Sequence, residues 1–212
     1  MSITSNYLKT RIHGLINTMG TLNLRPEQLA APLPSVADSH LPDSKTGNLK
    51  TASAMKRLAR LRAGHPLIRK VAKNILNYSE VPSNHYRSEA MAIADYVKEN
   101  VRYLRDPDGI EEIMDPVLMI EEMRRGEAAG DCDDMSLLLA SLLLSVGIRP
   151  YFRMVRYSGP KWAFWQPFNH IYVTVYENNP GEQKQRIALD PILKKKMIGY
   201  EVPHVSGKEV AV

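Results

Sequence analysis

The sequence predicts an α+β fold in which helices pack on an antiparallel sheet. Two observations support this prediction. Apolar residues recur at helical spacing along much of the chain as far as Val146, and beyond Gly147 the pattern changes to the alternation typical of strands. Helices that come first and strands that come last favour an α+β architecture. A chain of 212 residues is long enough for one sizeable core with an appendage, or for two small domains.

Helices are expected wherever apolar residues recur every three or four positions. Pro66 stands at a first helical position, and Asp115 precedes Pro116 as an N-cap. The segment that begins at Cys132 is apolar nearly all round, so it should be a central buried helix that ends at Gly147. The expected helices span residues 6–19, 52–63, 66–77, 86–101, 116–125 and 132–146.

Strands and connections follow from the same reading. Strands are expected over residues 149–157, 170–176 and 186–190, with a turn at 178–181. Prolines and small polar residues between 32 and 52 predict a linker or an extended arm. The predicted organisation divides the chain into an N-terminal helix with a basic arm, a pair of basic amphipathic helices, a main domain and a C-terminal tail, at residues 1–52, 53–85, 86–193 and 194–212.

Composition and charge limit the possible classes of protein. The chain has one cysteine and therefore no internal disulfide, which fits a reducing, cytoplasmic compartment. We expect neither a membrane span nor a secretory signal, because no apolar run is long enough and the first residues lack an apolar core. Residues 1–74 carry 12 Lys and Arg against 3 Asp and Glu, whereas residues 75–212 carry 16 against 20. Basic arms bind nucleic-acid phosphates or acidic protein surfaces, and the scarcity of aromatic residues in this arm favours a solvated face or protein docking.

Cys132 is the first candidate for chemistry. It lies at the predicted start of a helix, where unpaired N–H groups and the helix dipole stabilise a thiolate. The small residues 128–130 before it would let a substrate backbone approach closely. Neighbouring carboxylates would raise the thiol pKa if they faced it, so we expect them to act as helix caps and first-turn groups that point elsewhere; they are Asp131, Asp133 and Asp134.

A histidine and an aspartate lie on the two strands of the expected hairpin. If its centre falls near Pro180, paired residue numbers sum to about 360, and His170 lies directly opposite Asp190. Directly opposed residues have Cβ atoms about 5 Å apart, so a carboxylate can hold an imidazole N–H. A slip of one residue would place the two side chains on opposite faces.

The motifs around these residues resemble those of the transglutaminase-like superfamily. Residues 130–134 (GDCDD), with Ser136-Leu137-Leu138 and Gly147-Ile148, look like its nucleophile motif. Residues 169–173 (NHIYV) resemble its histidine strand, and residues 188–191 (ALDP) its aspartate strand. The lead-in to the cysteine is also similar, at Tyr103, Asp106-Pro107 and Asp115-Pro116. The likeness covers about residues 86–193, and the short form is similar to versions carried by phages and prophages.

The resemblance implies a papain-like α+β fold with a Cys-His-Asp triad. Cys132 would be the nucleophile, His170 the general base and acid, and Asp190 the residue that orients the imidazole. The thiol would attack an amide carbonyl to form a thioester, which water or a second amine then resolves. Hydrolysis makes the protein a peptidase or amidase, and transfer to an amine makes it a transglutaminase. Hydrolysis is expected more often among short microbial members, and a protein or peptide is the expected substrate.

Further site residues are predicted around the triad. The backbone N–H of Cys132 is one donor for an oxyanion hole, and Gln166 or Tyr103 could supply the second. Trp162 and Trp165 either line a substrate cleft or pack on the sheet edge. No metal or cofactor is expected, since no second cluster of histidines or cysteines has ligand spacing.

Two other classes of function stay open. The chain could be a structural or assembly protein, such as a phage virion component in an infected bacterial cell, that uses the same fold as an interaction module. Its basic N-terminal arm would then bind the assembly partner. A nucleic-acid-binding module is the third alternative, and it rests on the uneven charge alone.

Overall fold

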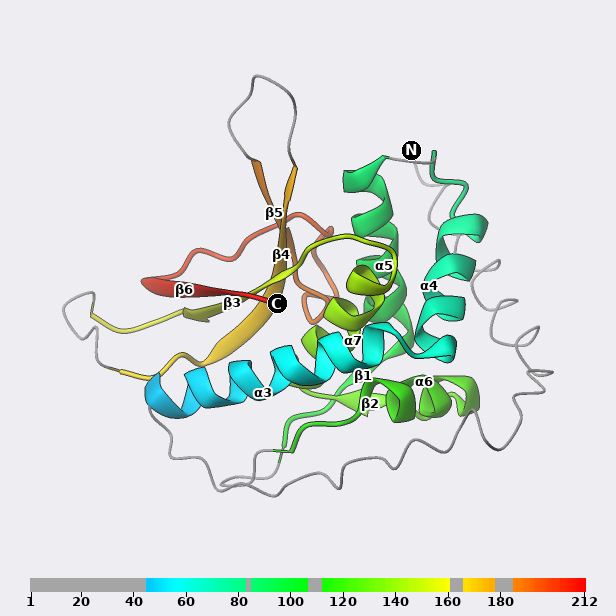
Figure 1. Ribbon diagram of the computed structural model, residues 1–212. Coiled ribbons are helices and arrows are strands. Elements are labelled where there is room, and N and C mark those ends of the chain that lie inside the picture. Colours follow the sequence, from blue (N-terminus) through cyan, green and yellow to red (C-terminus); the bar gives the residue numbers. More distant parts are fainter. Residues whose placement is uncertain (1–44, 83–84, 107–111, 161–165, 178–184) are drawn as a thin grey trace.

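The computed structural model describes residues 45–82, 85–106, 112–160, 166–177 and 185–212. Helices fill one half of the molecule and an antiparallel sheet the other, which confirms the predicted α+β class (Figure 1). The elements in chain order are α3 (Lys45–Ala63), α4 (Pro66–Tyr78), α5 (Tyr86–Asn100), β1 (Arg102–Tyr103), α6 (Pro116–Arg125), β2 (Ala129–Gly130), α7 (Cys132–Ser145), β3 (Tyr151–Arg156), β4 (His170–Glu177), β5 (Gln185–Leu189) and β6 (Ser206–Ala211).

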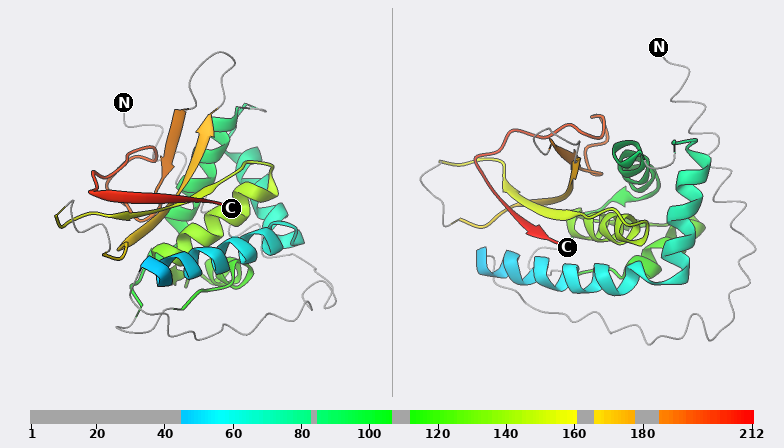
Figure 2. Two further views of the ribbon diagram at one scale, coloured as in Figure 1. Left: turned by 60° about the vertical axis from the view of Figure 1, so that its left-hand side comes forward. Right: turned by 45° about the horizontal axis from the view of Figure 1, so that its top comes forward.

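Helix α7 is the centre of the fold. It packs against α3, α4 and α5, and its remaining side contacts β4 (Figure 2). Burial on all sides explains why its sequence is apolar nearly all round. The helix begins at Cys132 and ends one residue earlier than predicted, and Gly147 follows with a φ of 84°, a conformation that glycine adopts without strain.

The sheet has four antiparallel strands in the order β5-β4-β3-β6. The three predicted strands are present within two residues of their expected bounds. Strand β6 was not predicted: it lies in the expected polar tail, yet it pairs with β3 along six residues, including Phe152 with Val210. It is an edge strand with mostly exposed or half-exposed positions, so its sequence lacks the alternation that marks a half-buried strand.

Helix α3 is longer than its sequence pattern predicted. It begins at Lys45, so the last part of the expected linker at 32–52 is helical. Leu49 and Ala52 continue the buried face formed by Met55 and Ala59, and this packing outweighs the polar composition of the segment. The extension has a consequence for the site, because Asn48 Oδ1 accepts the backbone N–H of Phe168 at 3.0 Å, two residues before His170. The expected helix 6–19 and turn 178–181 lie outside the described residues.

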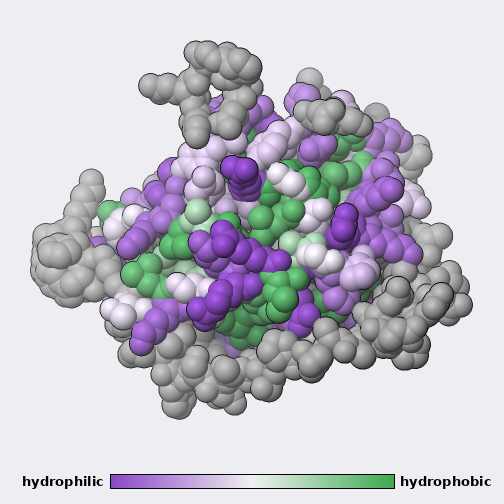
Figure 3. All heavy atoms as spheres, in the orientation of Figure 1, coloured by the Kyte–Doolittle hydropathy of each residue, from purple (hydrophilic) through white to green (hydrophobic). Residues whose placement is uncertain are grey.

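The surface of the described residues mixes polar and apolar groups. No helix among them is long and apolar enough to cross a membrane. On the face in Figure 3, hydrophobic residues lie between hydrophilic ones. A hollow of about 670 Å³ opens where α4 meets the C-terminal end of α7, with Lys73 and Val146 among its lining residues. It therefore lies at the opposite end of α7 from Cys132.

A buried ion pair joins α3 to α6. Arg62 Nε donates to Asp115 Oδ2 at 2.7 Å, and Nη2 lies 2.6 Å from the same oxygen. The two side chains are 5% and 9% exposed. The other oxygen of Asp115 accepts the backbone N–H of Val117 at 2.8 Å and so caps α6, as predicted. One carboxylate thus starts a helix and fixes it to α3.

Replacing Arg62 with methionine should destabilise the protein strongly, because the Asp115 carboxylate would stay buried without its cation. The expected loss is about 3 kcal/mol in the free energy of unfolding, measured by urea denaturation. Arg60, exposed on the same helix, supplies the control, and Arg60→Met should change stability by no more than about 0.5 kcal/mol. Equal losses in the two variants would contradict a structural role for the ion pair.

Candidate active site

The start of α7 fixes the position of the thiol. Asp131 is the N-cap, and its Oδ1 accepts the backbone N–H groups of Asp133 at 2.9 Å and Asp134 at 3.4 Å. Asp134 returns the interaction, since its Oδ2 accepts the N–H of Asp131 at 3.3 Å. Such a reciprocal capping box satisfies donors that the first turn of a helix leaves unpaired. Cys132 is therefore held between two capping residues.

Gly130 is required by packing within the protein. A Cβ at this position would lie 2.8 Å from the Cβ and Oδ2 of Asp134 and 2.9 Å from Met119 Cε, so no side chain fits. Gly130 also pairs with Tyr103 in the short parallel bridge of β1 and β2. The glycine is needed for the close packing of this bridge on the capping box, and the predicted approach of a substrate backbone stays a prediction.

The expected orientation of the carboxylates is wrong for Asp133. The sulfur of Cys132 lies 3.3 Å from Asp133 Oδ1, so the thiol donates to this carboxylate. Burial raises the pKa of Cys132 well above its ordinary value, and the charges of Asp133 and Asp131 add to the rise. A backbone hydrogen bond from Ile171 acts in the opposite direction. The thiol is thus protonated at rest, because the helix N-terminus does not outweigh burial and the two carboxylates.

The same three residues bring possible metal ligands together. One ligand atom each from Asp131, Cys132 and Asp133 lie within 4.8 Å of one another. The Asp131 carboxylate caps α7, however, and Asp133 accepts the thiol proton. These contacts already account for the carboxylates, so we assign no metal to this group of described residues.

His170 and Asp190 form a buried hydrogen-bonded pair. His170 Nε2 lies 2.8 Å from Asp190 Oδ2, and the two side chains are 3% and 4% exposed. Asp190 Oδ1 also accepts the backbone N–H of Ile192 at 3.2 Å, which holds the carboxylate from its other side. Because a carboxylate only accepts, the imidazole proton lies on Nε2, and Nδ1 is left as the basic nitrogen.

The register of the hairpin differs from the predicted one by two residues. Val173 pairs with Leu189, where the predicted register pairs Val173 with Ile187. His170 is therefore not directly opposite Asp190; the two are diagonal neighbours. Side chains on a strand alternate between faces, so a shift of two residues keeps both on the same face. The pair survives the error for this reason.

The histidine strand lies beside the thiol. Ile171, the residue after His170, directs its backbone N–H to the Cys132 sulfur, while its carbonyl accepts the Ser136 hydroxyl at 3.3 Å. These bonds attach the start of β4 to the first turn of α7. The three predicted triad residues therefore lie where the start of β4 meets the start of α7. Their catalytic role stays a prediction.

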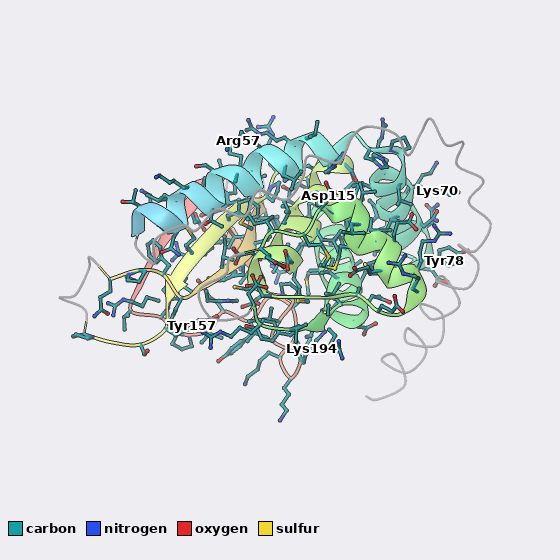
Figure 4. The ribbon with its side chains drawn as sticks, turned by 90° about the horizontal axis from the view of Figure 1, so that it is seen from below. Arg57, Lys70, Tyr78, Asp115, Tyr157 and Lys194 are labelled. Carbon is teal, nitrogen blue, oxygen red and sulfur yellow. The ribbon has the colours of Figure 1, made fainter. Side chains whose placement is uncertain are left out.

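Two tyrosines that the sequence analysis missed stack on the imidazole. The ring of Tyr157 lies at a centroid distance of 5.1 Å from that of His170, and the ring of Tyr172 lies at 5.7 Å. Tyr172 could have been found, because it lies two residues after His170 and so on the same face of β4. Tyr157 follows the end of β3 (Figure 4), and only the pairing of β3 with β4 brings it to the histidine.

The other predicted site residues have different outcomes. Tyr103 is 43% exposed, and its pKa is raised by partial burial and by the charges of Cys132 and Asp131. Gln166 Oε1 accepts a hydrogen bond from Arg156 Nη1 at 2.9 Å, so its side-chain oxygen is bound to the last residue of β3. Trp162 and Trp165 lie outside the described residues.

Comparison with known proteins defines the class. Residues 69–191 match the family model of the Transglutaminase-like superfamily, which is more than half of the chain. The protein therefore belongs to this superfamily, and the resemblance in its motifs is confirmed. Among curated proteins no match is found. A crystal structure of a candidate cysteine protease from Cytophaga hutchinsonii is similar over 66% of this chain, with 20% identity and a TM-score of 0.41. The shared part spans 42% of that protein's chain.

Replacing Asp133 with asparagine should lower the pKa of the Cys132 thiol, because it removes a negative charge and the acceptor of the thiol proton. The thiolate fraction at a given pH then rises, so the curve of alkylation rate against pH moves to lower pH by about half a unit or more. The rate of alkylation by iodoacetamide, measured over a range of pH, gives this curve. The control is Glu127→Gln, which changes an exposed side chain that pairs with Arg125 and should leave the curve unchanged. If the curve of the Asp133→Asn variant coincides with that of the native protein, the carboxylate does not act on the thiol.

Proposed function

We propose that the protein is a cysteine hydrolase that cleaves amide bonds in a protein or peptide substrate through Cys132, His170 and Asp190. The main support for the proposal is the buried hydrogen bond between His170 and Asp190. Ile171, the residue after His170, makes a backbone hydrogen bond to Cys132 and so connects this pair to the thiol. Membership of the superfamily supports the same chemistry. A buried imidazole whose Nε2 is held by a carboxylate and whose Nδ1 is free to accept a proton is the arrangement that general-base catalysis needs.

The raised thiol pKa decides how the reaction would begin. Since Cys132 is protonated at rest, its proton passes to His170 Nδ1 as the sulfur attacks the carbonyl carbon. The tetrahedral intermediate collapses when the C–N bond breaks, and the imidazolium returns the proton to the leaving amine. Water then loses a proton to Nδ1 and attacks the thioester, and the sulfur leaves with that proton. Asp190 keeps the imidazole oriented and balances its charge during both steps.

The oxyanion would form close to two candidate donors. The first is the backbone N–H of Cys132, at the start of α7. The second is the hydroxyl of Tyr103, a partly exposed side chain whose pKa is raised by partial burial and by the charge of Cys132. We propose Tyr103 rather than Gln166, because the Tyr103 hydroxyl interacts electrostatically with Cys132, whereas the contact that the structure describes for Gln166 is with Arg156.

The acyl acceptor can be water or an amine, as the same thioester serves both. Water needs no binding site of its own, so hydrolysis is the minimum activity of this triad. We therefore propose a peptidase or amidase, with amine transfer as the alternative. Ammonia release from a glutaminyl peptide, measured beside incorporation of a fluorescent primary amine, separates the two. Incorporation that exceeds hydrolysis would make transfer the principal reaction.

Loss of the imidazole should make Cys132 much less reactive near neutral pH. In His170→Ala the thiol keeps its burial and its acidic neighbours but has no base, so iodoacetamide alkylation at pH 7 should slow by at least about tenfold. Its rate should recover at alkaline pH. His85 is exposed and hydrogen-bonds Ser88 on the surface, so His85→Ala should react like the native protein. Equal rates for native protein and His170→Ala would overturn the proposed triad.

An assembly role is supported by one observation. From Lys45 to Tyr78, helices α3 and α4 carry nine Lys and Arg and no Asp or Glu. Arg57 and Lys70 point outward from these helices (Figure 4). Such a surface fits an acidic region of a partner protein, including a virion protein in an infected cell, and it is compatible with an active thiol. The test is binding of a soluble acidic polypeptide to the protein at low salt, which we expect to occur. If the polypeptide does not bind, this second role loses its support.

A further inference from the structure

The two tyrosines that stack on His170 differ in what their hydroxyls do. The Tyr172 hydroxyl donates to Glu201 Oε1 at 2.6 Å, and the Glu201 carboxylate is also bound by Arg186 at 2.7 Å. The Tyr172 hydroxyl therefore already has a hydrogen-bond partner. The Tyr157 hydroxyl is buried, and it makes no hydrogen bond of standard geometry with any residue in the described part of the chain.

The surroundings of the Tyr157 hydroxyl are those of the triad. Burial raises its pKa first, and the Asp190 carboxylate raises it further, with a smaller contribution from Cys132. The hydroxyl therefore stays protonated, and the carboxylate that acts on it is that of Asp190. A buried donor without a good partner costs free energy, so its position beside this carboxylate requires an explanation.

The backbone ties Tyr157 to the start of the histidine strand. Its N–H donates to Asn169 Oδ1 at 3.1 Å, and the N–H of Asn169 donates to the carbonyl of Val155 at 3.0 Å. Asn169 immediately precedes His170, and Val155 pairs with His170 in the sheet. These hydrogen bonds therefore fix the position of Tyr157 relative to His170.

We propose that Tyr157 is a positioning residue for the His170–Asp190 pair: its ring fixes the plane of the imidazole and keeps water from the Nε2–Oδ2 hydrogen bond, and its hydroxyl donates to Asp190. This inference rests on the proposed function of the site. A carboxylate that accepts a further hydrogen bond binds a proton less strongly. The imidazolium formed during attack is then held less tightly, which lets it return its proton to the leaving amine in the next step.

The test removes one hydroxyl at a time from the two tyrosines whose rings stack on His170. In Tyr157→Phe the ring stays and Asp190 loses a donor, so it stabilises the imidazolium more. The apparent pKa of Cys132 alkylation should fall by about half a unit. In Tyr172→Phe the lost hydroxyl belonged to the Glu201 interaction, so the alkylation profile should move by less than about 0.2 units, even where urea unfolding shows a loss of stability.

The outcomes separate this inference from the proposed function. An unshifted profile in Tyr157→Phe, together with the expected loss in His170→Ala, overturns the role of Tyr157 and leaves the triad standing. An unchanged rate in His170→Ala overturns both. A second readout uses the native protein alone: the Nε2–H proton of His170 should give a downfield NMR signal that exchanges slowly with water near pH 7. Exchange as fast as that of an exposed imidazole would also overturn the inference, because water would then reach the bond.

Discussion

The site depends on the reciprocal capping of α7 by Asp131 and Asp134. Asp134 accepts the N–H of Asp131 through one oxygen, and through the other it accepts the N–H of Met114 at 2.7 Å. One buried carboxylate therefore joins the start of α7 to the segment that leads into α6. Burial raises the pKa of Asp134 to about 7, although both backbone hydrogen bonds act against the rise. Gly130 is required beside it, because no Cβ fits there.

This way of fixing the thiol conflicts with activating it. Acidic residues are good N-caps and interact well with the positive end of a helix. Here, however, they flank Cys132, and together with burial they raise the pKa of its thiol. The protein therefore does not hold a standing thiolate, and in the proposed reaction the proton has to be removed during the attack. That reaction needs a well-oriented base, and the buried His170–Asp190 hydrogen bond would supply this orientation.

The sequence predicted those parts of the site that local patterns determine. Cys132 at a helix start followed from the apolar run and from Gly147, and His170 with Asp190 followed from two clear strands. The hairpin register was wrong by two residues, and the pairing on one face persisted only because the error was even. The direction of Asp133, the start of α3 and the position of Tyr157 depend on contacts between distant segments. Spacing along the chain carries no information about such contacts.

The C-terminal segment supports the site from outside the part that matches the superfamily. The match ends at residue 191, whereas Glu201 and β6 lie beyond it. Glu201 binds Tyr172, whose ring stacks on the imidazole, and β6 completes the sheet beside β3, the strand that leads to Tyr157. The two tyrosines that stack on His170 are thus supported by residues that the sequence pattern assigned to a polar tail. Burial of the His170–Asp190 pair, and with it the strength of their hydrogen bond, is therefore a property of the whole sheet, since a hydrogen bond of this kind weakens when water reaches it.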